Sequence, residues 1–264
     1  MSGKIHWSPH GGVTRTWPVE KLVASVADAG YAGLEILIHE QWLDWKDPAD
    51  VARLKALLNR HHLACPAVCW RGNQGDLLFT NPANYASSKA YLAECVDVAT
   101  AMRAEAVLVW PRIAEGVSRP DALAAAARVL NDVGDLCRQR GVVVSLEFES
   151  VGNPLCGTPA ETIELIEKTG DFVTICCDTF HLYNRKLDAY ASVLPQRGKI
   201  GLVHLSDGER QVPGDSDFDF ASFVKAIKEI DYRGPIFVQV DPRSEGDIAR
   251  AYRRAVEIVA PLGR

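Results

Sequence analysis

The run Val142-Val143-Val144-Ser145-Leu146-Glu147 decides the fold of this chain. It is a short apolar stretch that ends in a carboxylate. Three later runs end in a polar residue in the same way: residues 173–178 in Asp178, 200–204 in His204 and 235–239 in Gln239. Continuous runs of Val, Ile, Leu and Cys are typical of parallel strands that are buried on both faces. The four runs therefore predict a parallel sheet covered by helices, with one polar side chain at the end of each strand.

The same pattern extends along the whole chain. The expected strands are residues 4–9, 33–38, 63–70, 104–110, 142–149, 172–178, 200–206 and 235–241. Segments with helical spacing of apolar residues alternate with them, at residues 18–29, 48–61, 85–102, 119–140, 159–168, 187–194, 220–230 and 247–259. Proline begins several of these helices and glycine follows others, as at Pro18 and Gly141. Eight units in 264 residues leave about 33 residues per unit, enough for one strand and one crossover helix.

This alternation predicts an α/β protein, a single (β/α)8 TIM barrel over residues 1–264. A doubly wound open sheet is the alternative. However, Gly11-Gly12 after the first strand is not the GxGxxG turn of a dinucleotide site. In a TIM barrel the loops that follow the strands form the active-site face. The polar residues at the strand ends are therefore expected to converge there.

Composition and charge exclude several classes of partner. A net charge of −5 gives no broad cationic surface for nucleic acid or for an anionic membrane. No signal-like or membrane-spanning apolar run is present, so a cytoplasmic protein is expected. The seven cysteines lie mostly in apolar runs, as reduced core residues do. Cys65 and Cys69 lack a second Cys/His pair at zinc spacing, which argues against a zinc knuckle.

Glu147, Asp178, His204 and Gln239 together form a candidate metal site. They offer carboxylate, imidazole and amide donors from four separate strands. Such a mixed set suits one divalent ion, with Mn²⁺ favoured and Co²⁺, Zn²⁺ or Mg²⁺ as alternatives. Each residue alone is weak evidence, because polar residues at strand ends are often simply exposed. Glu149 shares a strand face with Glu147 and is an alternative ligand.

Five short motifs resemble one known family. They are Ser145-Leu146-Glu147-Phe148, Cys177-Asp178-Thr179-Phe180-His181, Val203-His204-Leu205-Ser206-Asp207, Val212-Pro213-Gly214 and Tyr232-Arg233-Gly234-Pro235. In order and spacing, over essentially the whole chain, they resemble the sugar phosphate isomerase/epimerase family of xylose isomerase-like TIM barrels. The resemblance implies that Glu147, Asp178 and His204 are metal ligands. It also implies that His181 contacts substrate beside the metal and that Arg210 holds a substrate anion or hydroxyl.

Position 239 departs from the family pattern. The usual residue is a second glutamate, which exchanges the substrate's α-proton with the glutamate of strand five. Gln239 has an amide instead, which can coordinate through oxygen but cannot act as a base near pH 7. Either Asp241, two residues further on, takes that role, or the reaction needs a single base such as Glu147 or His181.

The resemblance therefore implies a metal-dependent isomerase or epimerase of a ketose or related polyol, acting through a metal-stabilised enolate. A lyase or dehydratase of a keto-sugar or keto-cyclitol on the same scaffold is the alternative. An inactive sugar-binding barrel is a minor one. Relatives of endonuclease IV share the fold, but they need ligands for three metals and a positive face, which this chain lacks. By analogy with relatives, a homodimer or homotetramer is expected.

Further candidate substrate contacts end or follow the early strands. Trp7, Trp70 and Trp110 could each stack on a sugar, with core packing as the equal alternative. His10, after the first strand, is a candidate contact, with a solvated loop histidine as the alternative. Glu35 lies mid-strand and is expected to be buried. It would then need a partner, either the substrate or an arginine in a core network.

Overall fold

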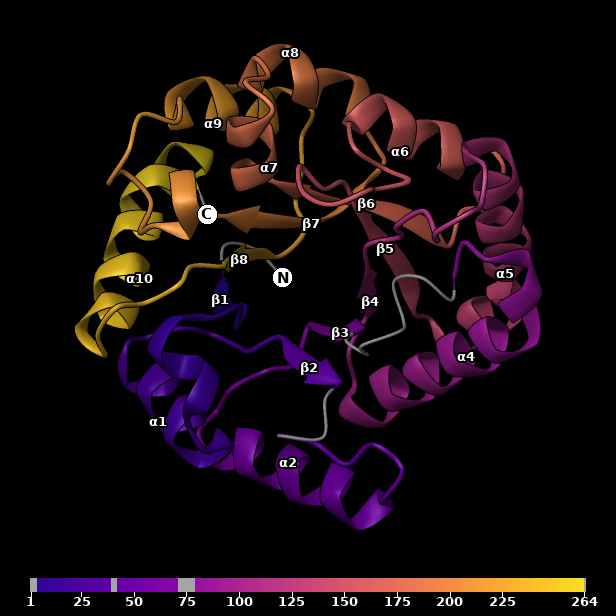
Figure 1. The fold of residues 1–264 in the computed structure, drawn as a ribbon. Helices are drawn as coiled ribbons and strands as arrows, with labels where there is room; N and C mark the ends of the chain where they lie inside the picture. The colour runs from indigo at the N-terminus through magenta and orange to yellow at the C-terminus, as the bar shows by residue number, and fades with distance from the viewer. Residues whose placement is uncertain (1–3, 39–41, 71–78, 264) are drawn as a thin grey trace.

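A computed structural model describes residues 4–38, 42–70 and 79–263. Eight parallel strands form a curled sheet that is ringed by helices (Figure 1). The strands are β1 (Ile5–Trp7), β2 (Ile36–Ile38), β3 (Ala67–Trp70), β4 (Ala106–Val109), β5 (Val143–Glu147), β6 (Val173–Asp178), β7 (Ile200–Leu205) and β8 (Ile236–Val238). The predicted TIM barrel is confirmed.

The helices occupy the segments between the strands. They are α1 (Val19–Asp28), α2 (Pro48–Arg60), α4 (Tyr85–Met102), α5 (Arg119–Arg140), α6 (Pro159–Ile166), α7 (Thr179–Asn184), α8 (Ala189–Val193), α9 (Phe220–Glu229) and α10 (Gly246–Val259). Short 3-10 helices are η1 (Gly12–Thr16), η2 (Pro82–Asn84), η3 (Leu194–Gln196), η4 (Gly208–Arg210) and η5 (Ala260–Leu262). Among the described residues, no helix is long and apolar enough to cross a membrane.

The ring closes between its first two strands. The hydrogen-bonded order is β1-β8-β7-β6-β5-β4-β3-β2, so β1 and β2 are the two edges of the sheet. A parallel bridge between Trp7 and Leu34 joins these edges. The Trp7 amide donates to the Gly33 carbonyl at 2.9 Å, and the Glu35 amide donates to the Trp7 carbonyl at 2.8 Å. These bonds pair the edge backbone groups that an open sheet would leave exposed.

Local capping explains where the helices begin and end. In α5, the Ser118 side chain accepts a hydrogen bond from the Asp121 amide, and a proline occupies the first turn. Gly141 follows the last turn with φ of 66°, a left-handed conformation that favours glycine. All seven cysteines are buried and none forms a disulfide, as their apolar surroundings predicted.

Two local features differ from the sequence prediction. Helix α7 begins directly after β6, and the Asp178 side chain caps it by accepting a hydrogen bond from the Phe180 amide at 2.8 Å. Its six residues are too few to show a helical period. Strand β8 ends at Val238, so Gln239 and Asp241 follow the strand instead of ending it. The Gln239 amide still donates to the Leu205 carbonyl at 3.0 Å, which keeps its position relative to β7.

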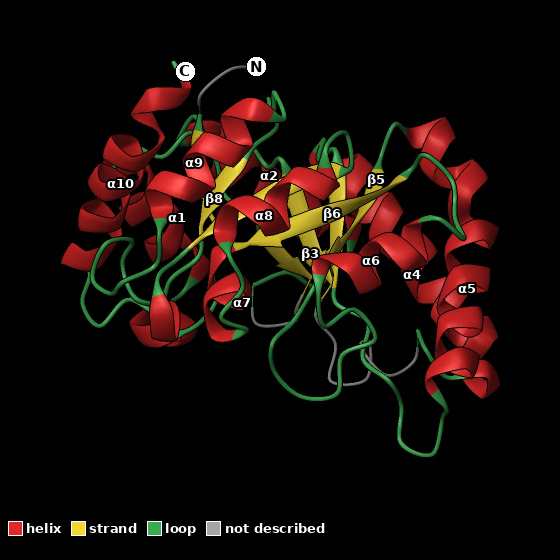
Figure 2. Ribbon diagram, turned by 90° about the horizontal axis from the view of Figure 1, so that it is seen from above, coloured by secondary structure: helices red, strands yellow, loops and turns green. Residues whose placement is uncertain are grey.

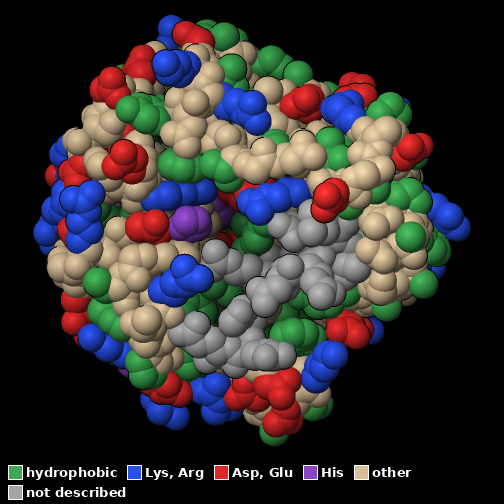
Figure 3. Space-filling view, in the orientation of Figure 1, with side chains coloured by type: hydrophobic (Ala, Val, Ile, Leu, Met, Phe, Trp, Pro, Cys, Tyr) green, Lys and Arg blue, Asp and Glu red, His purple; other side chains and the backbone are tan. Residues whose placement is uncertain are grey.

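The two ends of the barrel differ in their loops. Both chain termini lie at one end, whereas long loops gather at the other (Figure 2). The long loops are those that follow strands, on the face where the polar strand-end residues were expected. Basic, acidic and histidine side chains lie next to one another near the centre of the ring (Figure 3).

Candidate active site

The four predicted ligands lie at the same end of the barrel. Glu147 is the last residue of β5 and Asp178 is the last residue of β6. Asp178 pairs in register with His204 of β7, and Gln239 directly follows β8. All four side chains are buried, with no more than 5% of any residue exposed. Parallel strands therefore deliver these donors to one place, as the sequence predicted.

The donor atoms are close enough to share an ion. His204 Nδ1 lies 3.3 Å from Glu147 Oε1 and 4.0 Å from Asp178 Oδ2. Ligand-type atoms of Glu147, Asp178 and His181 lie within 4.8 Å of one another, as do those of Glu147, Cys176 and His204. The two groups share Glu147, which places this carboxylate at the centre of the cluster.

Several buried polar atoms of this cluster make no hydrogen bond to the described residues. They are both ring nitrogens of His204 and Oε1 of Gln239. Leaving such an atom unsatisfied costs about 1–3 kcal/mol. A divalent cation would use these lone pairs, and carboxylate, imidazole and amide oxygen are donors that such ions accept. The residues therefore fit a divalent metal.

Arg210 and His181 flank the cluster, as the resemblance implied. Arg210 Nη1 lies 2.5 Å from Asp178 Oδ2, and Nη2 lies 3.2 Å from His181 Nε2. The Ser150 amide donates to His181 Nδ1 at 2.9 Å, so a neutral His181 carries its hydrogen on Nε2. Arg210 and His181 then point two donors toward the same space. An acceptor such as a substrate oxygen would satisfy both.

The pKa values of these groups follow from burial and charge. Burial raises the pKa of Glu147 to about 7, although His204 and Arg210 oppose the shift. Burial also lowers the pKa of His181 to about 3 and keeps its ring neutral. Burial favours a neutral Asp178, but the Arg210 charge outweighs it, and the pKa of Asp178 falls below its usual range. Glu147 is therefore the carboxyl group best suited to exchange a proton near neutral pH.

His204 shows the opposite balance. Burial alone would lower its pKa, but the Glu147 carboxylate, 3.3 Å from Nδ1, and the charges of Glu35 and Asp178 raise the pKa to about 9. Without a metal, the surrounding carboxylates therefore favour a positively charged imidazole. A metal ion would supply that positive charge instead.

Ser8 is a member of the site that the sequence prediction missed. Gln239 Nε2 donates to Ser8 Oγ at 2.9 Å, and Ser8 Oγ donates to Glu35 Oε2. Glu35 is fully buried, as expected, and its Oε2 lies 3.8 Å from His204 Nε2. Ser8 shares a strand face with His6, two residues earlier, so period-two alternation along β1 was the available signal.

Two of the alternative acidic residues have partners of their own. Arg112 binds both Glu149 oxygens, at 2.8 and 2.9 Å, so Glu147 is the better placed ligand of the two. Asp241 Oδ1 lies 2.7 Å from His10 Nδ1, and both side chains are more than a third exposed. The structure therefore pairs Asp241 with His10 at the rim.

The tryptophans have different positions. Trp7 is fully buried and its ring packs edge-on against Tyr31 at 5.4 Å, so its prediction as a substrate contact is wrong. Its strand neighbours His6 and Ser8 occupy the opposite face, which explains why Trp7 points into the core. Trp110 directly follows β4, is partly buried, and stays a candidate. The side chain of Trp70, the last residue of β3, lies outside the described residues.

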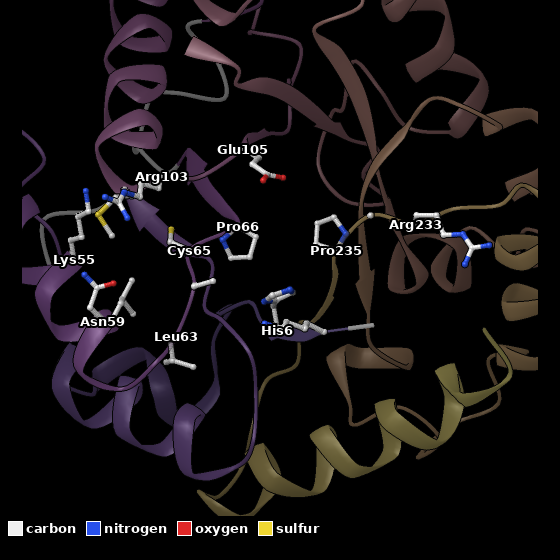
Figure 4. A pocket seen from close by; sticks show the side chains of 15 residues that line it. His6, Lys55, Asn59, Leu63, Cys65, Pro66, Arg103, Glu105, Arg233 and Pro235 are labelled. Carbon is white, nitrogen blue, oxygen red and sulfur yellow. The ribbon is translucent and has the colours of Figure 1, made fainter. Parts of the chain in front are cut away.

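A separate cavity of about 410 Å³ lies at the other end of the barrel (Figure 4). Its lining includes residues just before the strands, namely Lys4, Pro66, Glu105 and Pro235. None of the predicted ligands lines it. This cavity is therefore separate from the cluster of candidate ligands at the carboxyl ends of the strands.

Comparison with known proteins agrees with this geometry. An L-ribulose 3-epimerase from Methylomonas sp. (strain DH-1) is 27% identical over 257 residues, covering 89% of this chain and 87% of the relative. An inosose isomerase from Halalkalibacterium halodurans is 22% identical over 229 residues, covering 80% of this chain and 78% of the relative.

Solved structures share the fold. A D-psicose 3-epimerase crystallised in the presence of D-fructose superposes with a TM-score of 0.84 at 15% identity, covering 97% of this chain and 99% of the other. An IOLI protein with a bound zinc atom superposes with a TM-score of 0.79 at 16% identity, covering 98% of this chain and 99% of the other. Residues 23–261 match the family described as xylose isomerase-like TIM barrel. The chain belongs to the xylose isomerase-like TIM barrel family, as its strand-end motifs predicted.

Proposed function

We propose that this protein is a divalent-metal-dependent sugar isomerase or epimerase that acts on a ketose or related polyol. The observation that carries the proposal is the convergence of Glu147, Asp178, His204 and Gln239 at the active-site end of a TIM barrel. Both ring nitrogens of His204 and Oε1 of Gln239 are buried and lack hydrogen-bond partners among the described residues. Relatives named as ketose 3-epimerases and inosose isomerases support the substrate class.

The residues divide the chemistry between them. A bound divalent ion would polarise the substrate carbonyl and acidify the neighbouring C–H group. Glu147 takes that proton and returns it, because it is the carboxylate shared by both groups of close donor atoms and, among the described residues, carries no arginine partner of the kind that holds Asp178. His181 and Arg210 donate to a substrate oxygen and fix its position. Gln239 orients substrate and ion without taking a proton.

Gln239 favours one reaction type within this class. Epimerisation at one carbon needs a base on one face and an acid on the other. An isomerisation can instead move a proton between neighbouring carbons along one face, which needs only one carboxylate. Because position 239 is an amide, the arrangement supports a one-base isomerisation centred on Glu147. A lyase is the second candidate, with Glu147 taking the proton and His181 Nε2–H protonating the departing hydroxyl.

Other properties complete the proposal. We propose that the ion is Mn²⁺, because the mixed carboxylate, imidazole and amide set suits it, with Co²⁺, Zn²⁺ and Mg²⁺ as substitutes. Residues 1–264 would act as a single cytoplasmic domain and assemble as a homodimer or homotetramer. The assembly rests on analogy alone.

Metal content is the first test. Protein purified without chelator should carry about one Mn, Co, Zn or Mg per chain by mass spectrometry, and the Asp178→Ala variant should lose it. Keto-sugars and inososes are then incubated in D₂O. Deuterium in the product without a new ultraviolet absorption supports isomerisation, whereas a new enone band supports the lyase. Absence of metal, even after addition of Mn²⁺ or Co²⁺, would overturn the proposal.

A further inference from the structure

Glu35 is a buried carboxylate to which the chemistry above assigns no task. It lies just before β2, and none of its surface is exposed. A buried carboxylate needs hydrogen-bond donors around it. Glu35 has one such donor in Ser8, and it lies beside His204, with Oε2 3.8 Å from Nε2. It therefore lies on the Nε2 side of the His204 ring, whereas Glu147 lies on the Nδ1 side.

A chain of two hydrogen bonds that ends at the Glu35 carboxylate determines the orientation of the Gln239 amide. A carboxylate oxygen only accepts, so Ser8 donates its single hydroxyl hydrogen to Glu35. Ser8 Oγ must then accept from Gln239, which places the amide nitrogen toward Ser8 at 2.9 Å. The amide oxygen consequently points away from Ser8. This oxygen is buried and has no partner among the described residues.

Glu35 has a similar effect on His204. Without an ion, Glu147 lies closer to Nδ1 than Glu35 lies to Nε2, so the two carboxylates compete for the hydrogen of a neutral ring. A cation beside Nδ1, Glu147 and Asp178 would exclude the hydrogen from Nδ1, and the Glu35 carboxylate would then stabilise the form whose hydrogen sits on Nε2. The lone pair then belongs to Nδ1, the nitrogen that lies 3.3 Å from Glu147 and 4.0 Å from Asp178. Carboxylates behind ligand histidines commonly hold the ring and its tautomer in this way.

We propose that Glu35 is the positioning residue for two of the four metal ligands, an inference that rests on the proposed metal-dependent function. Through Ser8, Glu35 turns Gln239 Oε1 toward the ion site. Through its own contact with His204 Nε2, it leaves Nδ1 available as the ligand atom. It also keeps three buried carboxylates at the site, with Glu147 and Asp178, although position 239 carries an amide. The negative charge absent from position 239 is thereby supplied from the strand on the other side of β1.

Replacing Glu35 by glutamine tests the hydrogen-bond polarity with little change of shape. The Glu35→Gln amide can donate to Ser8, whose hydroxyl would then donate to Gln239 Oε1 and occupy the ligand oxygen. Mn²⁺ affinity of chelator-stripped protein, measured by titration calorimetry, should fall by about 10- to 100-fold. Ser8→Ala should weaken binding by about tenfold, at the lower end of that range. The spectrum of bound Mn²⁺ by electron paramagnetic resonance should change in both variants.

A double-mutant comparison separates positioning from loss of packing. In the Gln239→Glu variant both terminal atoms of the side chain are oxygens, so no hydrogen bond is needed to turn an oxygen toward the ion. Ser8→Ala should therefore cost much less Mn²⁺ affinity in that background. Ser145→Ala is the matched control, since it removes another buried hydroxyl, one with no partner among the described residues. It should leave Mn²⁺ affinity within about twofold of the starting protein, an ordinary effect for a site outside the network.

The binding measurements separate the proposed metal site from the proposed role of Glu35. If the unmodified protein fails to bind Mn²⁺, Co²⁺ or Zn²⁺ at millimolar concentration, the proposed function itself fails. If it binds and Glu35→Gln binds equally well with an unchanged spectrum, only the role of Glu35 is refuted. An equal cost of Ser8→Ala in both backgrounds would also refute it. Circular dichroism checks that each variant remains folded.

Discussion

Arg210→Met should destabilise the metal-free protein much more than the metal-loaded protein. Arg210 is the counter-ion of Asp178 at 2.5 Å, and the two residues are 5% and 0% exposed. Removing one partner of a buried ion pair costs about 3–5 kcal/mol, because the other charge stays buried alone. Asp178 keeps the hydrogen bond from the Phe180 amide in the variant, so we expect the lower end, about 3 kcal/mol.

This cost can be read as a change in melting temperature. A chain of this size shifts by about 2 °C per kcal/mol, so Arg210→Met should melt about 6 °C lower in the presence of EDTA. Mn²⁺ at 100 times its dissociation constant adds about 2.7 kcal/mol. The gain should be larger in the variant than in the unmodified protein, because the ion no longer competes with the guanidinium for Asp178.

Differential scanning fluorimetry with EDTA or Mn²⁺ measures both effects. Arg250→Met is the matched control, because Arg250 pairs with Asp215 at 2.6 Å on the surface, with the side chains 42% and 32% exposed. Such pairs contribute about 0–1 kcal/mol. Equal losses for the two variants would refute the buried-pair reasoning. A loss for Arg210→Met that Mn²⁺ fails to recover would show that Asp178 does not hold the ion.

Four further results are expected. Glu147→Gln should keep its fold by circular dichroism while turnover falls by about 10²- to 10⁴-fold, the usual share of a general base; normal turnover would remove Glu147 from that role. Mn²⁺ affinity should rise between pH 6 and 9, because Glu147, with a pKa of about 7, and His204, with a pKa of about 9, must lose protons to bind it. Metal-free protein should instead lose stability over pH 7–9: the folded-state pKa of His204 lies above its ordinary 6.5, so its stabilising proton is lost as pH rises through 9, and urea titrations at each pH check the sign. Trp7→Ala should cost about 3–5 kcal/mol in urea unfolding without raising KM, and a raised KM would return Trp7 to the substrate site.

The elements that the sequence predicts well are those with a long, regular pattern. The helix over residues 85–102 and the helix over residues 119–140 match α4 and α5 at both ends, since each has several turns of helical spacing. Strand ends are less predictable, because a parallel strand stops where its neighbours stop, and those neighbours are distant in sequence. Residues 235–241 illustrate this, as pairing in β8 covers only Ile236–Val238.

The site shows the same limit. Glu147, Asp178 and His204 could be predicted because each ends or nearly ends a strand, and the fold fixes where strand ends meet. For Ser8, period-two alternation after β1 gives only the face on which its side chain lies and does not identify its partners. Its role depends on contacts with Gln239 and Glu35, which come from other strands. Trp7 failed for a related reason, since one residue's shift along a strand exchanges the barrel interior for the helix layer.

The pairing of β1 with β8 also determines when, during folding, the four candidate donors can come together. The hydrogen bond between Ser8 and Gln239 joins residues 231 positions apart, across the pairing of β1 with β8. During synthesis the amino end of the chain emerges first, so β1 cannot pair with β8 until nearly the whole chain has been made. Contacts of such long separation form late and slow the folding of a domain. A nascent or truncated chain that lacks β8 offers at most three of the four candidate donors, so we expect such a chain to bind a divalent ion more weakly than the complete barrel does.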